Sequence, residues 1–260
     1  MFEGKYFLFS LEKGVGVLTL NRPPYNIFEA GFYVELGEVE DHIAAQEGIR
    51  CLVINANGKC FSAGIDLNYL QGVSSAYVLE KLPWLQKIYG FWQEQNYPVI
   101  AAVQGLCTGS GMEFILGADI RIAAEGARFS LPEVQLGLSP DMGGTSRLTR
   151  LVGMGQAKRL ILTGEEIGAE EALRIGLVNA VYPAEELLPA ARKLAARIVQ
   201  NAPIAVRACK AAMNEGMDLD MDEALDAEVR EFSGCFMTED QKRGMQAFLN
   251  KQKNIEFYNK

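Results

Sequence analysis

Residues 60–67 read CFSAGIDL and residues 105–114 read GLCTGSGMEF, and both segments end a short apolar run with small residues. A third segment, FSLPEVQLGLSPDMGGTSRL at residues 129–148, carries two more acids. Small residues let a substrate carbonyl approach backbone N–H groups, which a bulky side chain would prevent. The three segments therefore predict amide donors for an oxyanion together with carboxylates that move protons, the combination that acyl-thioester chemistry requires.

Apolar strands and amphipathic helices surround these segments. Short apolar runs that end in polar or turn residues predict strands at residues 16–20, 51–55, 99–103 and 119–124. Apolar residues spaced by three or four positions predict helices over residues 28–43, 74–95 and 184–199. The alternation indicates an α/β fold. Because helical patterns dominate the rest of the chain, we expect a core domain at residues 1–195 and a helical region at residues 196–260.

The composition is typical of a globular protein and disfavours nucleic-acid and membrane partners. Of the 260 residues, 49% are hydrophobic and 22% are charged, which allows a substantial core. The net charge of −8 disfavours a general affinity for nucleic acid or anionic lipid. The longest apolar region, residues 99–124, is interrupted by Glu113 and Asp119, which a membrane span would not carry without reason.

The cysteine and histidine content argues against a metal site and against secretion. The five cysteines form no CxxC pair and His42 is the one histidine, so we expect no zinc site and give His42 a structural role. Scattered cysteines fit a reducing compartment. The first residues show no basic stretch followed by a long apolar one, so we expect no signal peptide and a cytoplasmic protein.

The segment GLCTGSGMEF predicts a turn from a strand into a helix. Gly105, Gly109 and Gly111 bracket this turn, and we expect the helix to begin at about Met112. The N-terminus of a helix exposes unpaired N–H groups and a positive dipole end, which would stabilise an enolate oxygen. Glu113 lies in the first turn, close to such a site. By itself the segment is equally compatible with a packing turn.

The segment CFSAGIDL predicts a second tight turn after a strand. Ala63 and Gly64 allow close backbone approach, and the N–H of Ile65 is a candidate second donor. We expect Asp66 to cap the helix that follows.

Two further acids follow in the third segment. Glu133 comes after Pro132, and Asp141 precedes a pair of glycines. A carboxyl in apolar surroundings is partly desolvated, which raises its pKa. Acids gathered at one thioester would divide the general-base and general-acid roles. Their spacing does not show that they converge, and an acid beside glycines is also an ordinary turn residue.

Taken together, the segments resemble the enoyl-CoA hydratase/isomerase family, also called the crotonase family. The resemblance runs from VGVLTLNRP at residues 15–23 through the three segments to NAPIAVRACK and CFMTEDQKRGMQAFLNK near the C-terminus. It implies an acyl-CoA substrate, in which coenzyme A is part of the substrate and no further cofactor is needed. It also implies a spiral of ββα units with a helical C-terminal region that forms a homotrimer, and commonly a hexamer of two trimers.

The resemblance assigns roles to individual residues. The backbone N–H groups of Ile65 and Ser110 would form the oxyanion hole. Glu113 would activate a water molecule that attacks the β-carbon of a 2-enoyl-CoA, and protonated Glu133 would deliver a proton to the α-carbon. The coenzyme A path would follow the residues Ala63, Ile65, Asp66 and Leu67. For its phosphates we consider Arg22 and, from a neighbouring subunit, Lys251.

Two positions depart from the hydratase pattern. Ser110 and Asp141 stand where hydratases often have glycine. An acid at position 141 resembles the dienoyl-CoA isomerases, which use an acid there to move protons between distant carbons. We therefore predict an enoyl-CoA hydratase and keep a dienoyl-CoA isomerase using Glu113, Glu133 and Asp141 as the alternative. Hydrolysis of an acyl-CoA and a non-catalytic acyl-CoA-binding protein are more remote alternatives.

Overall fold

A computed structural model describes residues 1–253 and 255–260 of the chain. Its main sheet has seven strands in the order β1-β2-β3-β4-β5-β7-β10. The strands β1 to β3 are antiparallel, and the pairs from β3 onward are parallel. The bounds of the strands are Phe2–Glu3 (β1), Phe7–Glu12 (β2), Val15–Leu20 (β3), Cys51–Ala56 (β4), Val99–Val103 (β5), Ile120–Ala124 (β7) and Ala180–Tyr182 (β10).

A smaller three-stranded sheet lies beside the main one. It contains Leu106–Thr108 (β6), Arg128–Ser130 (β8) and Ile167–Gly168 (β9) in the order β6-β8-β9. The strand β6 occupies the middle of the segment for which we predict only a turn. Its parallel pairing with β8 brings the end of GLCTGSGMEF close to the residues that precede Glu133.

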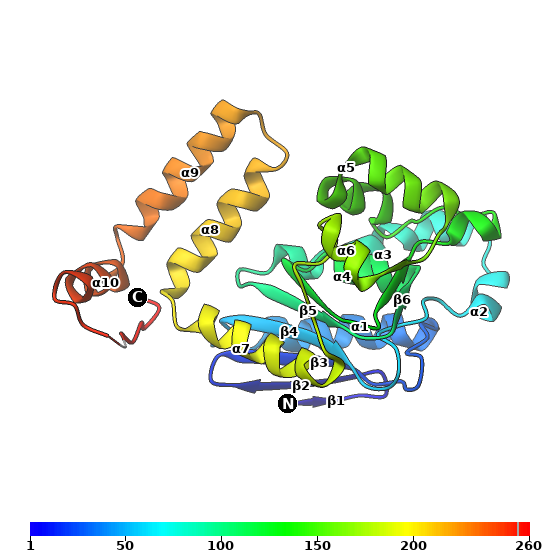
Figure 1. The fold of residues 1–260 in the computed structure, drawn as a ribbon, viewed down its shortest axis with the longest axis horizontal. Coiled ribbons are helices and arrows are strands. Elements are labelled where there is room, and N and C mark those ends of the chain that lie inside the picture. The colour runs from blue at the N-terminus through cyan, green and yellow to red at the C-terminus, as the bar shows by residue number, and fades with distance from the viewer. Residues whose placement is uncertain (254) are drawn as a thin grey trace.

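Helices cover both faces of the main sheet (Figure 1). Because side chains alternate along a strand, Cys51 and Val53 of β4 face one way and pack with α7 (Leu187–Val199), which follows the 3-10 turn η2 (Ala184–Glu186). Leu52 and Ile54 face the opposite way, into the larger core. That core is completed by the helices α1 (Ala30–Ala44), α3 (Ser75–Glu94) and α4 (Ser110–Leu116).

Aromatic rings fill the core between α1, α3 and α4. Phe28 stacks on Phe32 with ring centroids 3.7 Å apart, and Tyr89 and Trp92 of α3 each lie 5.5 Å from Phe114 of α4. Tyr89 and Trp92 are therefore buried by packing among helices, whereas Tyr77 and Trp84 of the same helix are 41% and 43% exposed. Phe28, which we expected inside the first helix, precedes it and pairs with Ile65 across a short bridge.

The remaining elements of the core are short helices and the long helix α5. Their bounds are Leu67–Gln71 (α2), Glu133–Leu136 (the 3-10 turn η1), Gly144–Thr163 (α5) and Ala169–Arg174 (α6). In the described residues no helix is both long and apolar enough to cross a membrane. His42 lies on α1 with its ring 5.6 Å from Phe2 and 5.8 Å from Phe9, in agreement with a structural role.

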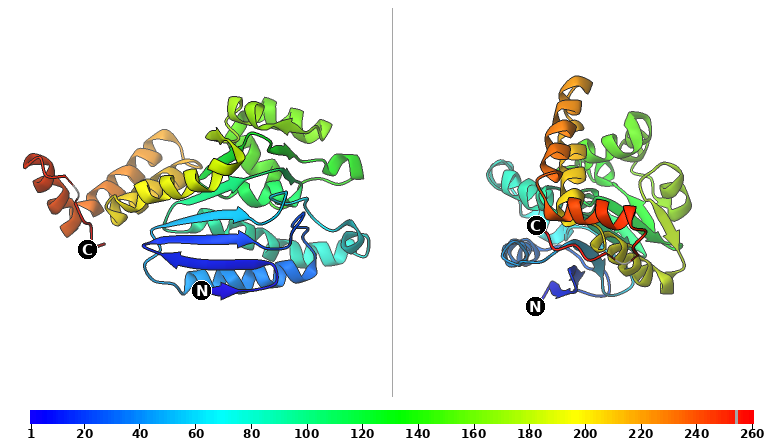
Figure 2. Two further views of the ribbon diagram at one scale, coloured as in Figure 1. Left: turned by 60° about the horizontal axis from the view of Figure 1, so that its bottom comes forward. Right: turned by 90° about the vertical axis from the view of Figure 1, so that its left-hand side faces the viewer.

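The C-terminal helices form an arm that leaves the body of the molecule (Figure 1; Figure 2). The arm consists of α8 (Pro203–Gly216), α9 (Met221–Cys235) and α10 (Glu239–Leu249). At its base the buried Lys210 donates 2.8 Å to Asp119 and 3.0 Å to the carbonyl oxygen of Tyr97. The helical C-terminal region is thus confirmed, and its division from the core at residue 196 stays a prediction.

Candidate active site

The two glycine-containing turns lie side by side. Ser62 and Cys107 form a parallel bridge, in which the Ser62 amide donates to Leu106 at 3.0 Å and the Thr108 amide donates to Ser62 at 3.1 Å. The Ser62 hydroxyl accepts from the Gly64 amide at 3.0 Å. Two segments that are far apart in sequence are therefore hydrogen-bonded to each other shortly after the ends of β4 and β5.

The close approach of these turns requires glycine at position 64. Gly64 has a φ of +83°, and a Cβ atom there would lie 2.8 Å from the carbonyl oxygen of Thr108 and 3.7 Å from the amide nitrogen of Ser110. No L side chain is accommodated without moving one of the turns. The backbone of residues 64–65 is thereby held next to the N-terminus of α4.

The amides of Ile65 and Ser110 remain available as donors. In the bridge between Phe28 and Ile65, the hydrogen bonds use the carbonyl of Gly64 and the amide of Asp66. The Ile65 amide is therefore directed away from Phe28 and donates to no acceptor in the described part of the chain. Ser110 is the first residue of α4, where helical amides have no intrahelical partner, and its amide is equally unpaired among residues 1–253 and 255–260.

Glu113 lies one turn into α4, three residues after Ser110. Its side chain is buried, and its Oε1 accepts hydrogen bonds of 2.8 Å from the amides of Met142 and Gly144. A Cβ atom on Gly144 would lie 2.8 Å from the same oxygen, so glycine is needed there for the carboxyl to fit. Oε2 has no hydrogen-bond partner among the described residues, and it can therefore accept or donate toward a bound molecule.

The surroundings of Glu113 make its carboxyl a weaker acid than an exposed glutamate. Burial raises the pKa of Glu113 to about 8, and the negative charge of Asp141 adds to this effect. The amides of Gly144 and Met142 oppose the rise because they stabilise the carboxylate. A proton carried at neutral pH therefore belongs on Oε2, since Oε1 is already occupied by two donors.

Glu133 lies at the start of η1, close to the turn that precedes α4. Its Oε1 lies 3.2 Å from the place that a Cβ atom of Gly109 would occupy, and Gly109 immediately precedes Ser110. Burial raises the pKa of Glu133. Its Oε2 is buried and has no partner in the described residues. Glu113 and Glu133 thus flank the same two amides from different elements.

Asp141 lies on the exposed rim of the turn that holds Glu113. Its carbonyl oxygen accepts 2.7 Å from the Gln86 amide group of α3, and its peptide continues into the Met142 amide that donates to Glu113. Its charge raises the pKa values of both Glu113 and Glu133. The structure therefore brings together the three acids that the sequence singles out.

The position of Asp141 gives a testable pH effect. We expect Asp141→Asn to lower the pKa of Glu113, because it removes a nearby negative charge while preserving the shape of the side chain. In an activity profile against pH, the step that belongs to Glu113 then moves to lower pH. If this step stays at the same pH, the charge of Asp141 does not affect the pKa of Glu113.

Two buried tyrosines lie near the start of α4, and the sequence analysis did not single them out. The hydroxyls of Tyr33 on α1 and Tyr89 on α3 are buried and have no hydrogen-bond partner among the described residues. The Tyr33 hydroxyl is close to the side chain of Ser110, which influences its pKa. The Ser110 side chain therefore lies near Tyr33 of α1.

The residues expected along the coenzyme A path lie in the turn of the segment CFSAGIDL and at the start of α2. The Ala63 amide donates to Tyr25 at 2.9 Å, and the Asp66 carboxylate caps α2 by accepting from the Asn68 amide at 2.9 Å. The capping role of Asp66 is confirmed. Leu67 begins α2 and is 49% exposed, so its side chain is available for contact with a ligand.

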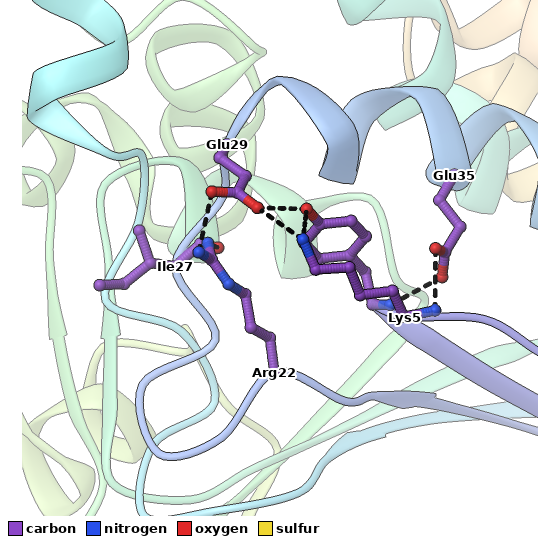
Figure 3. Close-up of polar contacts among 6 residues, drawn as sticks. Lys5, Arg22, Ile27, Glu29 and Glu35 are labelled. Carbon is purple, nitrogen blue, oxygen red and sulfur yellow. Dashed lines mark hydrogen bonds and ion pairs between the residues drawn. The ribbon is translucent and has the colours of Figure 1, made fainter.

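The two basic residues considered for the coenzyme A phosphates, Arg22 and Lys251, differ in their surroundings. The Arg22 guanidinium donates 2.8 Å to Glu29 and 2.8 Å to the carbonyl oxygen of Ile27, and Glu29 also pairs with Lys5 at 3.2 Å (Figure 3). Arg22 is therefore already paired within its own chain, with a carboxylate that it shares with Lys5. Lys251 lies after α10 on the arm and is exposed.

Comparison with known proteins adds an independent finding. A model of the enoyl-CoA hydratase/isomerase family matches residues 10–258. A crotonyl-CoA hydratase of Syntrophomonas wolfei is 43% identical over 93% of this chain and 94% of its own length. A short-chain-enoyl-CoA hydratase of Clostridium acetobutylicum is 42% identical over 96% of each chain.

Solved structures agree with the sequence relatives. An enoyl-CoA hydratase structure from Geobacillus kaustophilus superposes with a TM-score of 0.95 at 30% identity, covering 100% of this chain and 98% of that one. An enoyl-CoA hydratase structure from Bacillus anthracis gives a TM-score of 0.93 at 33% identity, covering 98% and 100%. The expected spiral fold with its helical C-terminal region is confirmed.

Proposed function

This chain belongs to the enoyl-CoA hydratase/isomerase family, and from that membership we propose that it hydrates short-chain 2-enoyl-CoA thioesters. The observation that carries the proposal is the arrangement of two unpaired amides, at Ile65 and Ser110, beside the carboxyls of Glu113 and Glu133. The names of the two relatives with identities of 43% and 42% support the same reaction and a short acyl group.

In the proposed reaction the amides bind the thioester oxygen and the carboxyls transfer protons. The amides of Ile65 and Ser110 bind the thioester oxygen and draw electron density from the 2,3 double bond, which makes C3 electrophilic. The Glu113 carboxylate takes a proton from a water molecule as its oxygen bonds to C3. The electron pair of the double bond moves to C2 and the thioester oxygen, and protonated Glu133 then delivers its proton to C2. Water is thereby added across the double bond.

The direct test is hydration of crotonyl-CoA by the purified protein. We expect the absorbance of the conjugated thioester to fall and 3-hydroxybutyryl-CoA to accumulate. Loss of absorbance without that product would point to another reaction of the family. Absence of turnover on 2-enoyl-CoAs of every chain length would refute the proposal.

A dienoyl-CoA isomerase remains the second candidate because Asp141 lies near the two glutamates. An isomerase needs a third group to exchange a proton with a distant carbon, and Asp141 influences the pKa of both glutamates from the rim. This alternative predicts that Asp141→Asn abolishes isomerisation of 3,5-dienoyl-CoA. A hydratase retains crotonyl-CoA turnover in that variant.

The exposed side of the arm supports a trimeric assembly that can stack as a hexamer. Many of its apolar side chains are more than two-fifths exposed in the single chain, namely Met213, Met217, Met221, Leu225, Val229, Phe232, Phe236, Met237, Met245, Phe248 and Leu249. Apolar patches of this extent mark interaction surfaces. We propose that neighbouring copies cover them, and that Lys251 of one copy approaches the coenzyme A site of another.

The assembly can be tested by a charge in the apolar surface of the arm. We expect Phe232→Glu to lower the molar mass in sedimentation equilibrium, because an unpaired carboxylate in an apolar contact is strongly disfavoured. Phe232 is 66% exposed and meets Phe236 edge-on at 5.1 Å, so we expect the fold to tolerate the change. Val34→Glu, at a 60% exposed position on α1, is the matched control. Equal masses for the two variants would exclude the arm as the interface.

A further inference from the structure

Arg147 occupies an unusual position on α5. It lies in the first turn of this helix, where the helix dipole disfavours a cation. Its side chain is half-buried rather than extended into solvent, and burial lowers its pKa. A long cation that is kept in such a place requires compensating contacts.

The contacts of Arg147 join three elements around the turn that holds Glu113. Its Nη1 donates 2.9 Å to the carbonyl oxygen of Met142, and its Nε donates 3.1 Å to Gln93 of α3. Its Nη2 lies 3.3 Å from the place that a Cβ atom of Gly90 would occupy. The guanidinium is thus inserted between α3 and the turn that precedes α5.

The peptide held by Arg147 lies between the two that hold Glu113. The Met142 amide belongs to the peptide of residues 141–142, and the Gly144 amide belongs to the peptide of residues 143–144. The carbonyl that Arg147 grips belongs to the peptide between them, that of residues 142–143. Fixing the middle peptide restricts both neighbouring amides, because each is joined to it through one Cα atom and can turn only about the φ and ψ angles of that residue.

Gly143 shows how closely the guanidinium follows this turn. Its φ is +101°, and the Cβ atom of any other residue would overlap the guanidinium of Arg147. The turn and the arginine are therefore fitted to each other. Gln86 of α3 donates to the carbonyl oxygen of Asp141 in the same turn. The turn is therefore held by one charged side chain, Arg147, and one neutral side chain, Gln86.

We infer that Arg147 is a positioning residue, which holds the Met142 and Gly144 amides on Oε1 of Glu113 and so aims Oε2 at the reacting water. The inference rests on the proposed hydration and assigns to Arg147 no contact with substrate. The charges that face Glu113 are the carboxyls of Asp141 and Glu133 and this guanidinium. Loss of Arg147 removes a cation and loosens two amide donors, and both changes favour the protonated form of Glu113.

The test compares Arg147→Met and Arg147→Lys with the matched control Arg150→Met. Arg150 lies one turn later on α5 and pairs with Asp218 at the surface, so its variant loses the same charge away from the turn. We expect Arg147→Met to lower kcat for crotonyl-CoA by about 10- to 100-fold, as small misplacements of a catalytic group do. KM should change little, Arg147→Lys should recover part of the loss, and Arg150→Met should match the wild type.

A double variant separates positioning from a general structural role. In a Glu113→Gln background, Arg147→Met should cost little further activity, because the group that it positions is already gone. Losses that multiply would overturn the inference. Where Arg147→Met does not fold, Gln93→Met removes one of the supports of the guanidinium and should give a smaller effect in the same direction.

A titration makes the inference independent of turnover. Carboxyl-carbon NMR of the whole protein should place the pKa of Glu113 higher in Arg147→Met than in the wild type, and unchanged in Arg150→Met. An unchanged Glu113 pKa in Arg147→Met would overturn the inference. If the pKa of Glu113 rises in Arg147→Met but the wild type does not hydrate crotonyl-CoA, the proposed function alone is refuted.

Discussion

Glu113→Gln lowers kcat for crotonyl-CoA by about 10²- to 10⁴-fold, the range expected when a proton-transfer group is lost. The glutamine carbonyl can still accept from the Met142 and Gly144 amides, so the turn keeps its shape. The amide group that replaces Oε2 cannot take a proton from water. We therefore expect kcat to fall while binding of the acyl-CoA is retained.

The matched control is Glu40→Gln. Glu40 is also a buried glutamate, its pKa is raised by burial to about 9, and it lies on α1 with an Oε1 that has no partner among the described residues. With that pKa the Glu40 carboxyl is already neutral at neutral pH, so Glu40→Gln replaces a second buried glutamate without changing the charge of the core at that pH. Steady-state kinetics should show near-normal turnover for Glu40→Gln. Normal turnover in Glu113→Gln as well would reject the acid–base role.

The pH dependence distinguishes a base from an acid at this position. With its pKa near 8, Glu113 is largely protonated at neutral pH in the free protein. If Glu113 is the base, kcat/KM rises with pH up to about 8 as the carboxylate forms. A decrease over the same range would exchange the roles of Glu113 and Glu133.

The same pKa has a consequence for stability. The unfolded chain loses the Glu113 proton near pH 4.5 whereas the folded chain keeps it to about pH 8. Its contribution to stability is complete below the lower value and is lost as pH rises through the higher one, by up to about 1.4 kcal/mol per pH unit. In denaturant titrations, Glu113→Gln should therefore gain stability relative to the wild type between pH 5 and pH 8.

The fold was predictable from the sequence wherever apolar periodicity is strong. The strands β3, β4, β5 and β7 and the helices α1 and α3 lie close to their predicted positions. The strand β6 was missed because three residues between glycines have no period of their own, and pairing with β8 decides their conformation. The strand β2 was missed for a similar reason, since it depends on the antiparallel partner β3.

The site was predictable in its residue types but not in its geometry. Small residues and acids indicated an oxyanion turn, yet only the bridge between Ser62 and Cys107 brings the two turns together. Arg147 was missed because its role depends on a carbonyl five residues earlier and on α3. The pair Gly143–Gly144 was the available signal, since each glycine leaves room for a neighbouring side chain.

Gly64→Ala is the second change with a large expected effect, a loss of about 10²- to 10³-fold in kcat, which is typical of removing one oxyanion donor. The added methyl would lie 2.8 Å from the carbonyl oxygen of Thr108, on a backbone with a φ of +83°. Backbone oxygen cannot move aside as the end of a flexible side chain can. The turn must shift, and the Ile65 amide then moves away from the Ser110 amide.

Gly48→Ala separates this displacement from backbone strain. Gly48 has a nearly equal φ of +85°, but a Cβ atom there meets no other atom within 4 Å. Both variants carry the cost of a left-handed alanine, on the order of 1 kcal/mol, and Gly64→Ala should unfold at the lower temperature because its methyl group also displaces the turn. Only Gly64→Ala should lose turnover, because only there does the methyl group separate the two amides. Equal activity in the two variants would mean that the thioester oxygen does not bind between Ile65 and Ser110.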